Sequence, residues 1–171
     1  MFSFSTDEEL TGIVGTAAIS AALALRLVAE VLEIAGRKQS SERVTELIRK
    51  AKKDAGRLAH LAREDGRAYK EYMRARRERR PDVQAKLRRA IAVPLQAAGT
   101  AAAAIELCQE ALPYMRGAIA ADICGATELL AGAVGAILCT VDVNLKPVED
   151  EQFAKKVRAA RDKLAARIGK D

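Results

Sequence analysis

The spacing of apolar residues predicts a chain made almost wholly of helices. Apolar positions recur every three or four residues through long segments, which is the period of one helix face. Glycine, proline and N-capping residues separate these segments, which span about 6–36, 40–77, 81–112, 122–144 and 149–168. We therefore expect an all-α protein, a single-domain bundle of about five long antiparallel helices that occupies residues 1–171.

Pro94 lies inside the third of these segments. Proline lacks a backbone N–H, and its ring clashes with the carbonyl group four residues earlier in a helix. We therefore expect the helix over 81–112 to kink at Pro94, or to be divided there into two helices.

One charged residue interrupts the apolar face of the second helix. That face contains, in order, Val44, Ile48, Ala51, Ala55, Leu58, Ala62, Asp65, Tyr69 and Tyr72. An ionised carboxylate is costly to bury, so Asp65 predicts a specific partner, a helix cap or a polar cavity. The ordinary alternative is a residue close enough to a helix end to reach water.

The fourth helix has a face of small residues. It carries Gly125, Glu128, Gly132, Gly135, Cys139 and Asp142 at helical spacing. Small residues let another backbone approach closely, and most stripes of this kind are packing surfaces. Together with the alanine-rich surfaces of the other helices, this face predicts a homo-oligomer such as a homodimer.

The charge of the chain is unevenly placed. The formal net charge is +6, but residues 37–90 alone contain 19 Lys and Arg against 8 Asp and Glu. Such a basic surface suits a polyanion, which includes nucleic acid, acidic lipid or a small molecule with several carboxylates. The densest run, from Arg74 to Arg80, has only Tyr69 and Tyr72 as aromatic neighbours, so a solvated helix end is favoured over nucleic-acid binding.

Several kinds of site are disfavoured. The odd set Cys108, Cys124 and Cys139 lacks the spacing of a zinc site, and we expect three buried thiols. His60 is the only histidine and lies off the Asp65 face, so neither a metal site nor a histidine-dependent triad is expected. No phosphate loop or dinucleotide fingerprint is present, so no nucleotide cofactor is indicated.

The sequence also favours a cytoplasmic protein without membrane-spanning helices. The first residues are acidic where a signal peptide would be basic. Two long apolar windows are interrupted by charged residues, the first by Arg26, Glu30 and Glu33 and the second by Asp122 and Glu128. The remaining apolar runs are too short to span a bilayer.

Short motifs occur in an order that resembles one known family. They are Asp65-Gly66-Arg67-Ala68-Tyr69, Val93-Pro94-Leu95, Ala121-Asp122 with Ala126, Thr140-Val141-Asp142-Val143-Asn144-Leu145, and Asp150-Glu151-Gln152-Phe153. Their order and spacing resemble the cyclodeaminase/cyclohydrolase family. This is the helical module of formiminotransferase-cyclodeaminase and of stand-alone methenyltetrahydrofolate cyclohydrolases.

The resemblance implies an activity on folate one-carbon adducts. Family members hydrolyse 5,10-methenyltetrahydrofolate to 10-formyltetrahydrofolate, or they cyclise formiminotetrahydrofolate with loss of ammonia. A tetrahydrofolate derivative is then the substrate, no metal is needed and no cofactor is tightly bound. Two carboxylates in different environments can divide the acid and base roles. The resemblance therefore implies Asp65 and Asp122 as the catalytic residues.

The resemblance also implies a set of substrate-binding residues. These are Gly15, Thr16, Arg37, Lys38, Tyr69 and Asn144. We expect Asp65 and Asp122 to approach one cleft together with the Gly15-Thr16 turn and Asn144. The basic segment would steer a folate-type molecule, with or without a polyglutamate tail, toward this cleft.

The chain departs from the family at positions expected to bind ligand. A glycine-rich N-terminal loop is reduced to Gly12-Ile13-Val14-Gly15-Thr16, which should alter or close the approach to a ligand. An amide-rich segment before Asp122 is lost, and an asparagine is replaced by Thr140. Two functions therefore stay open: an active folate enzyme with a modified pocket, or a non-catalytic, repurposed member that serves as a ligand-binding or assembly protein.

Overall fold

The computed structural model describes residues 12–37 and 41–169, and within them the chain is helical without strands. The elements are α1 (Gly12–Gly36), α2 (Glu42–Arg77), α3 (Val83–Ala111), the 3-10 helix η1 (Leu112–Tyr114), α4 (Ala118–Leu145) and α5 (Glu151–Ala166). The all-α prediction is confirmed, and the predicted ends of the last four helices lie within four residues of the observed ends. The predicted helix start near Thr6 lies outside the described residues.

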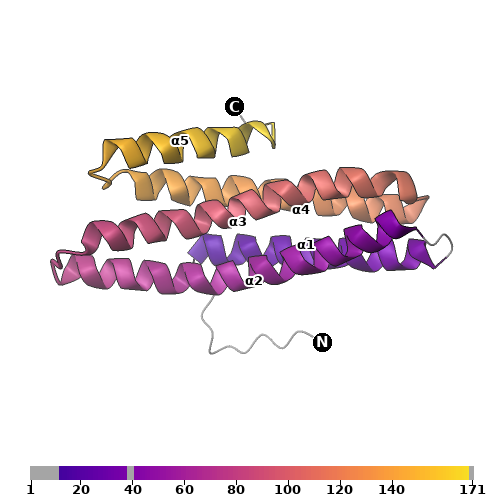
Figure 1. The fold of residues 1–171 in the computed structure, drawn as a ribbon, viewed down its shortest axis with the longest axis horizontal. Helices are drawn as coiled ribbons and strands as arrows, with labels where there is room; N and C mark the ends of the chain where they lie inside the picture. Colours follow the sequence, from indigo (N-terminus) through magenta and orange to yellow (C-terminus); the bar gives the residue numbers. More distant parts are fainter. Residues whose placement is uncertain (1–11, 38–40, 170–171) are drawn as a thin grey trace.

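Helices α1 to α4 run antiparallel in chain order, and α5 lies against α3 and α4 (Figure 1). α1 and α3 each pack against both α2 and α4. α2 has 36 residues and α1 has 25, which correspond to about 54 and 38 Å at about 1.5 Å per residue. α2 and α3 therefore extend beyond the first residue of α1, and this difference in length positions the candidate site.

Alanines occupy much of the core, so the helices approach one another closely. Leu25, Leu32 and Leu58 fill the space between α1 and α2 and are fully buried. A second group of buried residues joins the ends of α2 and α4 to α3 and α5: Tyr72, Leu87, Ala90, Ile91, Val141, Leu145, Ala154 and Val157. α5 begins at a side-chain cap, because the Asp150 carboxylate accepts from the backbone N–H groups of Gln152 and Phe153, both at 3.0 Å.

The third helix runs without interruption through Pro94. The expectation that Pro94 divides this segment into two helices is therefore wrong. Pro94 is buried on the face of α3 that packs into the bundle. A proline at this position leaves one backbone carbonyl of α3 without its usual donor.

The outer face of α4 is exposed and carries large apolar side chains. Leu129 is 54% exposed and Val143 is 59% exposed. Cys124 and Cys139 are also exposed, so the prediction of three buried thiols is wrong for these two; only Cys108 is buried, and burial raises the pKa of its thiol. Nothing in the described part of the chain covers this face, because α1, α3 and α5 pack on the other sides of α4.

Three helices are long and apolar enough to cross a membrane. They are α1, the stretch from α3 through η1, and α4, with mean hydropathies of 1.8, 1.5 and 1.7 in their most apolar windows. Within the bundle, 56%, 61% and 39% of these windows are buried. Length and composition therefore do not exclude a membrane, and the predicted absence of membrane-spanning helices stays a prediction.

Candidate functional site

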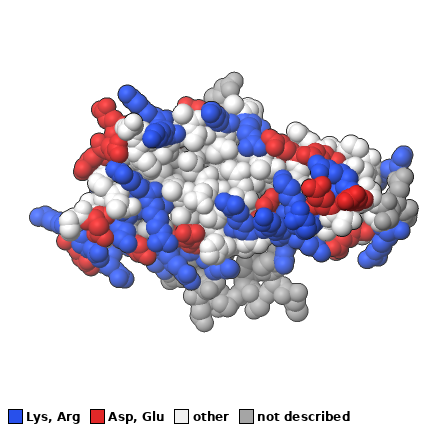
Figure 2. All heavy atoms as spheres, in the orientation of Figure 1, with Lys and Arg blue, Asp and Glu red and all other residues white. Residues whose placement is uncertain are grey.

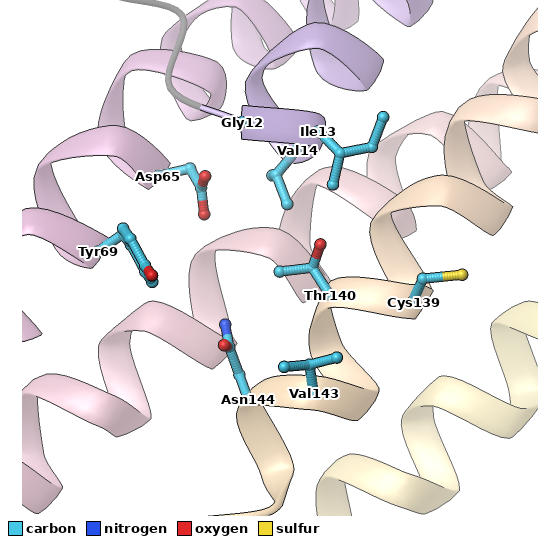
Figure 3. Close-up of a pocket in the computed structure, with 9 residues that line it drawn as sticks. All are labelled: Gly12, Ile13, Val14, Asp65, Tyr69, Cys139, Thr140, Val143 and Asn144. Atoms are coloured by element: carbon cyan, nitrogen blue, oxygen red, sulfur yellow. The ribbon is translucent and has the colours of Figure 1, made fainter. Parts of the chain in front are cut away.

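A cavity of about 470 Å³ lies where α1 begins, between α1, α2 and α4 (Figure 3). Its lining residues are Gly12, Ile13 and Val14 of α1, Asp65 and Tyr69 of α2, and Cys139, Thr140, Val143 and Asn144 of α4. Apolar atoms form most of the lining, and a few polar groups are placed among them. A concave, mainly apolar site of this size is typical of small-molecule binding.

Asp65 is the one buried charged residue of the described chain, with 7% of its surface exposed. It lies twelve residues before the end of α2, so the alternative of a helix end that reaches water is wrong. No described residue forms an ion pair or hydrogen bond with its carboxylate. We predicted a specific partner, a helix cap or a polar cavity for Asp65, and the structure places this residue at a cavity.

Burial changes the proton affinity of Asp65. Loss of hydration disfavours the ionised form and raises the pKa of the carboxyl group from 3.8 to about 6. A group with this pKa holds and releases a proton close to neutral pH. It can therefore serve as a general acid or a general base.

Asn144 faces the cavity from α4 and is held from behind by α3. Its side-chain Nδ2 donates a hydrogen bond to the backbone oxygen of Ala90 at 3.2 Å. Figure 3 shows Asp65 and Tyr69 together on the α2 side of the cavity and Asn144 projecting from α4. The structure thus brings Asp65, Tyr69 and Asn144 together, as the motifs led us to expect.

Gly15 and Thr16 do not form the expected turn. Both lie within α1, and the Thr16 hydroxyl donates to the Gly12 oxygen at 3.1 Å. Neither residue lines the cavity. The glycine that requires backbone freedom is Gly12, whose φ of +85° lies in the left-handed region where α1 begins.

Two other predicted residues are far from the cavity in the same chain. Asp122 is exposed near the start of α4, 18 residues before Thr140, which corresponds to about 27 Å along the helix. Arg37 follows the last residue of α1, 23 residues after Val14, or about 35 Å. The predicted approach of Asp65 and Asp122 to one cleft therefore does not occur within one chain, because a helix holds its ends apart. Lys38 lies outside the described residues.

Two lining residues were not predicted. Val143 directly precedes Asn144, and Cys139 lies at the edge with its side chain directed away from the cavity (Figure 3). Thr140, four residues before Asn144, lines the cavity as its place in the motif led us to expect. Ile13 and Val14, which stand where the family resemblance predicts a glycine-rich loop, form an apolar wall of the cavity. The cavity stays open, so the two side chains alter the site without closing it.

Positive charge lies outside the cavity. Among the described residues that line it, none is a lysine or an arginine. Two acidic residues of α2 form ion pairs with basic residues of α3: Glu64 with Arg89 at 3.2 Å, and Glu71 with Lys86 at 2.9 Å. Because these acidic side chains pair with α3, they do not offset the excess of lysine and arginine on the exposed surface of α2. Figure 2 shows basic side chains spread over one face of the molecule, with acidic ones between them and an uncharged area near the centre.

Across the described ranges, no group of three His, Cys, Asp or Glu residues could hold a metal ion.

Comparisons with known proteins agree with the arrangement of the helices. Residues 8–163 match a family described as formiminotransferase-cyclodeaminase. Among solved structures, formiminotetrahydrofolate cyclodeaminase from Thermotoga maritima is similar with a TM-score of 0.86 and 20% identity, over 92% of this chain and 82% of that chain. At this identity, the structural likeness shows a shared fold. No curated protein matches the sequence.

Proposed function

Because the chain belongs to the formiminotransferase-cyclodeaminase family, we propose that it converts a one-carbon adduct of tetrahydrofolate in the Asp65 cavity. The observation that carries this proposal is a buried carboxylate that has no partner among residues 12–37 and 41–169, placed at the wall of an open cavity. Such a group is costly for folding and useful for proton transfer.

The proposed substrates are 5,10-methenyltetrahydrofolate and formiminotetrahydrofolate. In the first reaction, water adds to the carbon between the two nitrogens, one carbon–nitrogen bond breaks, and 10-formyltetrahydrofolate and a proton are released. In the second, the N–H nitrogen outside the pterin ring (N10) attacks the formimino carbon, which the ring nitrogen N5 already carries, and ammonia leaves as the methenyl bridge forms. Asp65 would take the proton from the attacking O–H or N–H group and give one to the departing nitrogen. The ionised carboxylate would also stabilise the positive charge of the methenyl carbon.

We also propose that the working unit is a homodimer formed by the outer faces of α1 and α4. These faces expose large apolar side chains: Ile13, Leu23, Leu27, Leu129 and Val143. Gly125 and Gly132 are exposed on α4, and nothing lies within 4 Å of a Cβ built at either, so a second helix can approach there. A second copy of the chain fits this face better than lipid does, because Asp122 and Glu128 lie along it and are also exposed.

A two-fold axis near Gly132 would complete the site. Asp122 and Asp142 each lie ten residues from Gly132 on α4, so antiparallel packing of two α4 helices about this residue pairs their positions. Asp122 of the partner subunit would then lie beside Asp142, next to Val143 in the cavity wall. Arg37 lies at the same end of the bundle as Asp122, because α1 and α4 are antiparallel. One axis therefore accounts for both distant residues.

A non-catalytic member that binds a ligand in the same cavity is the second candidate. The wall formed by Ile13 and Val14 favours it, because apolar side chains stand where the family has a glycine-rich loop. Such a protein would use Asp65 to recognise a donor or a cation on the ligand, without turnover.

A folate conversion assay separates these functions. The purified protein is incubated with each substrate, and the absorbance of the methenyl form is followed: it should fall with methenyltetrahydrofolate as substrate or rise with formiminotetrahydrofolate. Asp65→Asn should reduce turnover by about 100-fold or more, because the amide keeps the shape and cannot exchange the proton. The matched control is Asp54→Asn, because Asp54 is on the same helix and forms a 3.9 Å ion pair with Lys50.

The outcomes of this assay are distinct. Folate binding without turnover, measured by titration calorimetry at low salt, would support the repurposed function. Absence of folate binding would reject both functions and leave the helical scaffold. Equal losses in Asp65→Asn and Asp54→Asn would show that the effect arises from helix α2 and not from the cavity.

A further inference from the structure

Pro94 changes the hydrogen bonding of α3 directly behind the candidate site. In a regular helix, the N–H of residue 94 would donate to the carbonyl of Ala90. Pro94 has no N–H, and its ring pushes the Ala90 carbonyl away from the helix axis. Ala90 is 1% exposed, so water cannot readily supply the missing donor. A buried carbonyl without a donor is unfavourable.

Asn144 provides that donor from another helix. Its Nδ2 lies 3.2 Å from the Ala90 oxygen, and the two residues are 54 positions apart in the chain. Asn144 also lines the cavity beside Asp65 and Tyr69. The side chain that satisfies α3 is therefore the same one that faces the ligand space.

This contact fixes the direction of the amide. The amide nitrogen is directed to the Ala90 carbonyl, which leaves the amide oxygen, Oδ1, as the group that accepts hydrogen bonds from the cavity. Asp65 supplies a second acceptor when it is ionised. Beside the Tyr69 and Thr140 hydroxyls, which can donate or accept, the described lining thus has these two acceptor-only groups and no lysine or arginine, which suits a ligand that carries N–H donors.

We propose that Pro94 is a positioning residue for Asn144, and that the resulting fixed Oδ1 selects ligands whose ring system presents an N–H donor. Without a proline, the N–H of residue 94 would satisfy the Ala90 carbonyl and the amide of Asn144 would be free to rotate. The identification of the ligand as a reduced pterin rests on the proposed function. The positioning of Asn144 by Pro94 is independent of that function, because it rests on the hydrogen bond between Asn144 and Ala90.

The first test separates binding from stability. Pro94→Ala restores a backbone N–H in the middle of a helix and should raise the thermal midpoint. The same variant should weaken the binding of 5-formyltetrahydrofolate, a stable folate probe, by about tenfold, because a free amide loses its fixed orientation. A merely structural proline would change stability and leave the affinity of the folded protein unaltered, and that result would overturn the proposal.

Gly99→Ala is the matched control. Gly99 lies five residues further along α3, and nothing lies within 4 Å of a Cβ built there. This substitution should also raise the thermal midpoint, because alanine favours the helix over glycine, while folate affinity stays at the wild-type value. Equal weakening of binding by Gly99→Ala and Pro94→Ala would assign the effect to helix stiffness and contradict the proposal.

The second test needs no ligand. Asn144→Leu is introduced into the wild-type chain and into the Pro94→Ala background, and the unfolding equilibrium constants are compared. The substitution should cost about tenfold more in the wild-type chain, where it leaves the Ala90 carbonyl without a donor. Equal costs in the two backgrounds would overturn the positioning proposal even if folate binds. Unequal costs in a protein that does not bind folate would reject the proposed function and support the link between Pro94 and Asn144.

Discussion

The middle of α2 and the start of α4 each carry an aspartate, and the two carboxylates differ in their exposure to solvent. Asp65 is 7% exposed and faces a cavity built by its own chain. Asp122 is exposed, about 27 Å along α4 from that cavity. Both aspartates belong to motifs of one family. The chemistry of Asp65 is set within one chain, whereas any chemistry of Asp122 depends on what covers the outer face of α4.

The two regions also differ in their apolar surroundings. Around Asp65, side chains of three helices remove water from the carboxylate and raise its pKa to about 6. Around Asp122, the side chain is exposed and the surface at the neighbouring Gly125 is open. The difference indicates that a motif residue becomes functional through its environment, and the proposed dimer would give Asp122 such an environment from a second chain.

The largest effect is expected when the outer face of α4 is blocked. Gly132→Leu should leave the single-chain fold intact, because nothing lies within 4 Å of a Cβ at this position. The added side chain should prevent two α4 helices from approaching, so sedimentation should change from dimer to monomer. Turnover should fall by about 100-fold, because Asp122 of the partner subunit no longer reaches the cavity.

Gly56→Leu serves as the control for this experiment. Gly56 is exposed on α2, and its Cβ position is also open. This variant should retain the dimer and its turnover. A Gly132→Leu protein that is monomeric and fully active would contradict a site shared between two chains.

A smaller effect is expected on the free energy of unfolding. Between pH 3.8 and about 6 the folded protein binds more protons at Asp65 than the unfolded chain does, so stability should decrease as pH rises through this window. The cost should be complete above about pH 7 and should amount to about 3 kcal/mol. Asp65→Asn should therefore stabilise the protein at pH 8 by about 1–3 kcal/mol, less than the full amount because a buried amide also lacks a partner.

Urea unfolding at pH 8 and pH 4 measures this difference. The gain from Asp65→Asn should be present at pH 8 and lost at pH 4, where the wild-type carboxyl group is protonated. Asp122→Asn should change the free energy by less than about 0.5 kcal/mol at either pH, because its side chain is exposed. A gain of similar size in both variants would remove the distinction between the two aspartates.

The smallest effect is expected at Arg37. Its charge lies outside the cavity, so it can contribute only through long-range attraction or across a dimer interface. Arg37→Ala should weaken the binding of polyglutamylated folate about threefold at low salt, and the difference should vanish at high salt. Titration calorimetry with monoglutamyl folate provides the comparison, because the shorter tail should respond less. An effect independent of salt would argue against charge steering.

Much of the fold follows from the sequence, because helical periodicity depends on residues three and four apart. The same periodicity identified Asp65 as a carboxylate on a buried face. Tyr69 and Asn144 followed from their motifs, and both reached the cavity. These successes share one cause, which is that each feature is encoded within a short stretch of one helix.

The missed features depend on contacts between distant segments. The cavity exists because α1 begins part-way along α2, and the apolar spacing does not reveal this offset. The continuity of α3 at Pro94 accompanies a hydrogen bond between Asn144 and Ala90, which belong to different helices. The separation of Asp122 from Asp65 within one chain could not be predicted, because a linear motif does not say which end of a helix, or which copy of the chain, contributes a residue to a site.

The pKa of Asp65 tests the central claim most directly, because the proposed chemistry requires a buried carboxyl group that exchanges its proton near neutral pH. Carbon-13 NMR of the side-chain carboxyl, with Asp65→Asn used to assign the resonance, gives this value in the ligand-free protein. The account predicts a pKa of about 6. A value below about 4.5 would mean that the carboxylate is hydrated or paired in solution. Asp65 would then not be the acid–base group of this cavity.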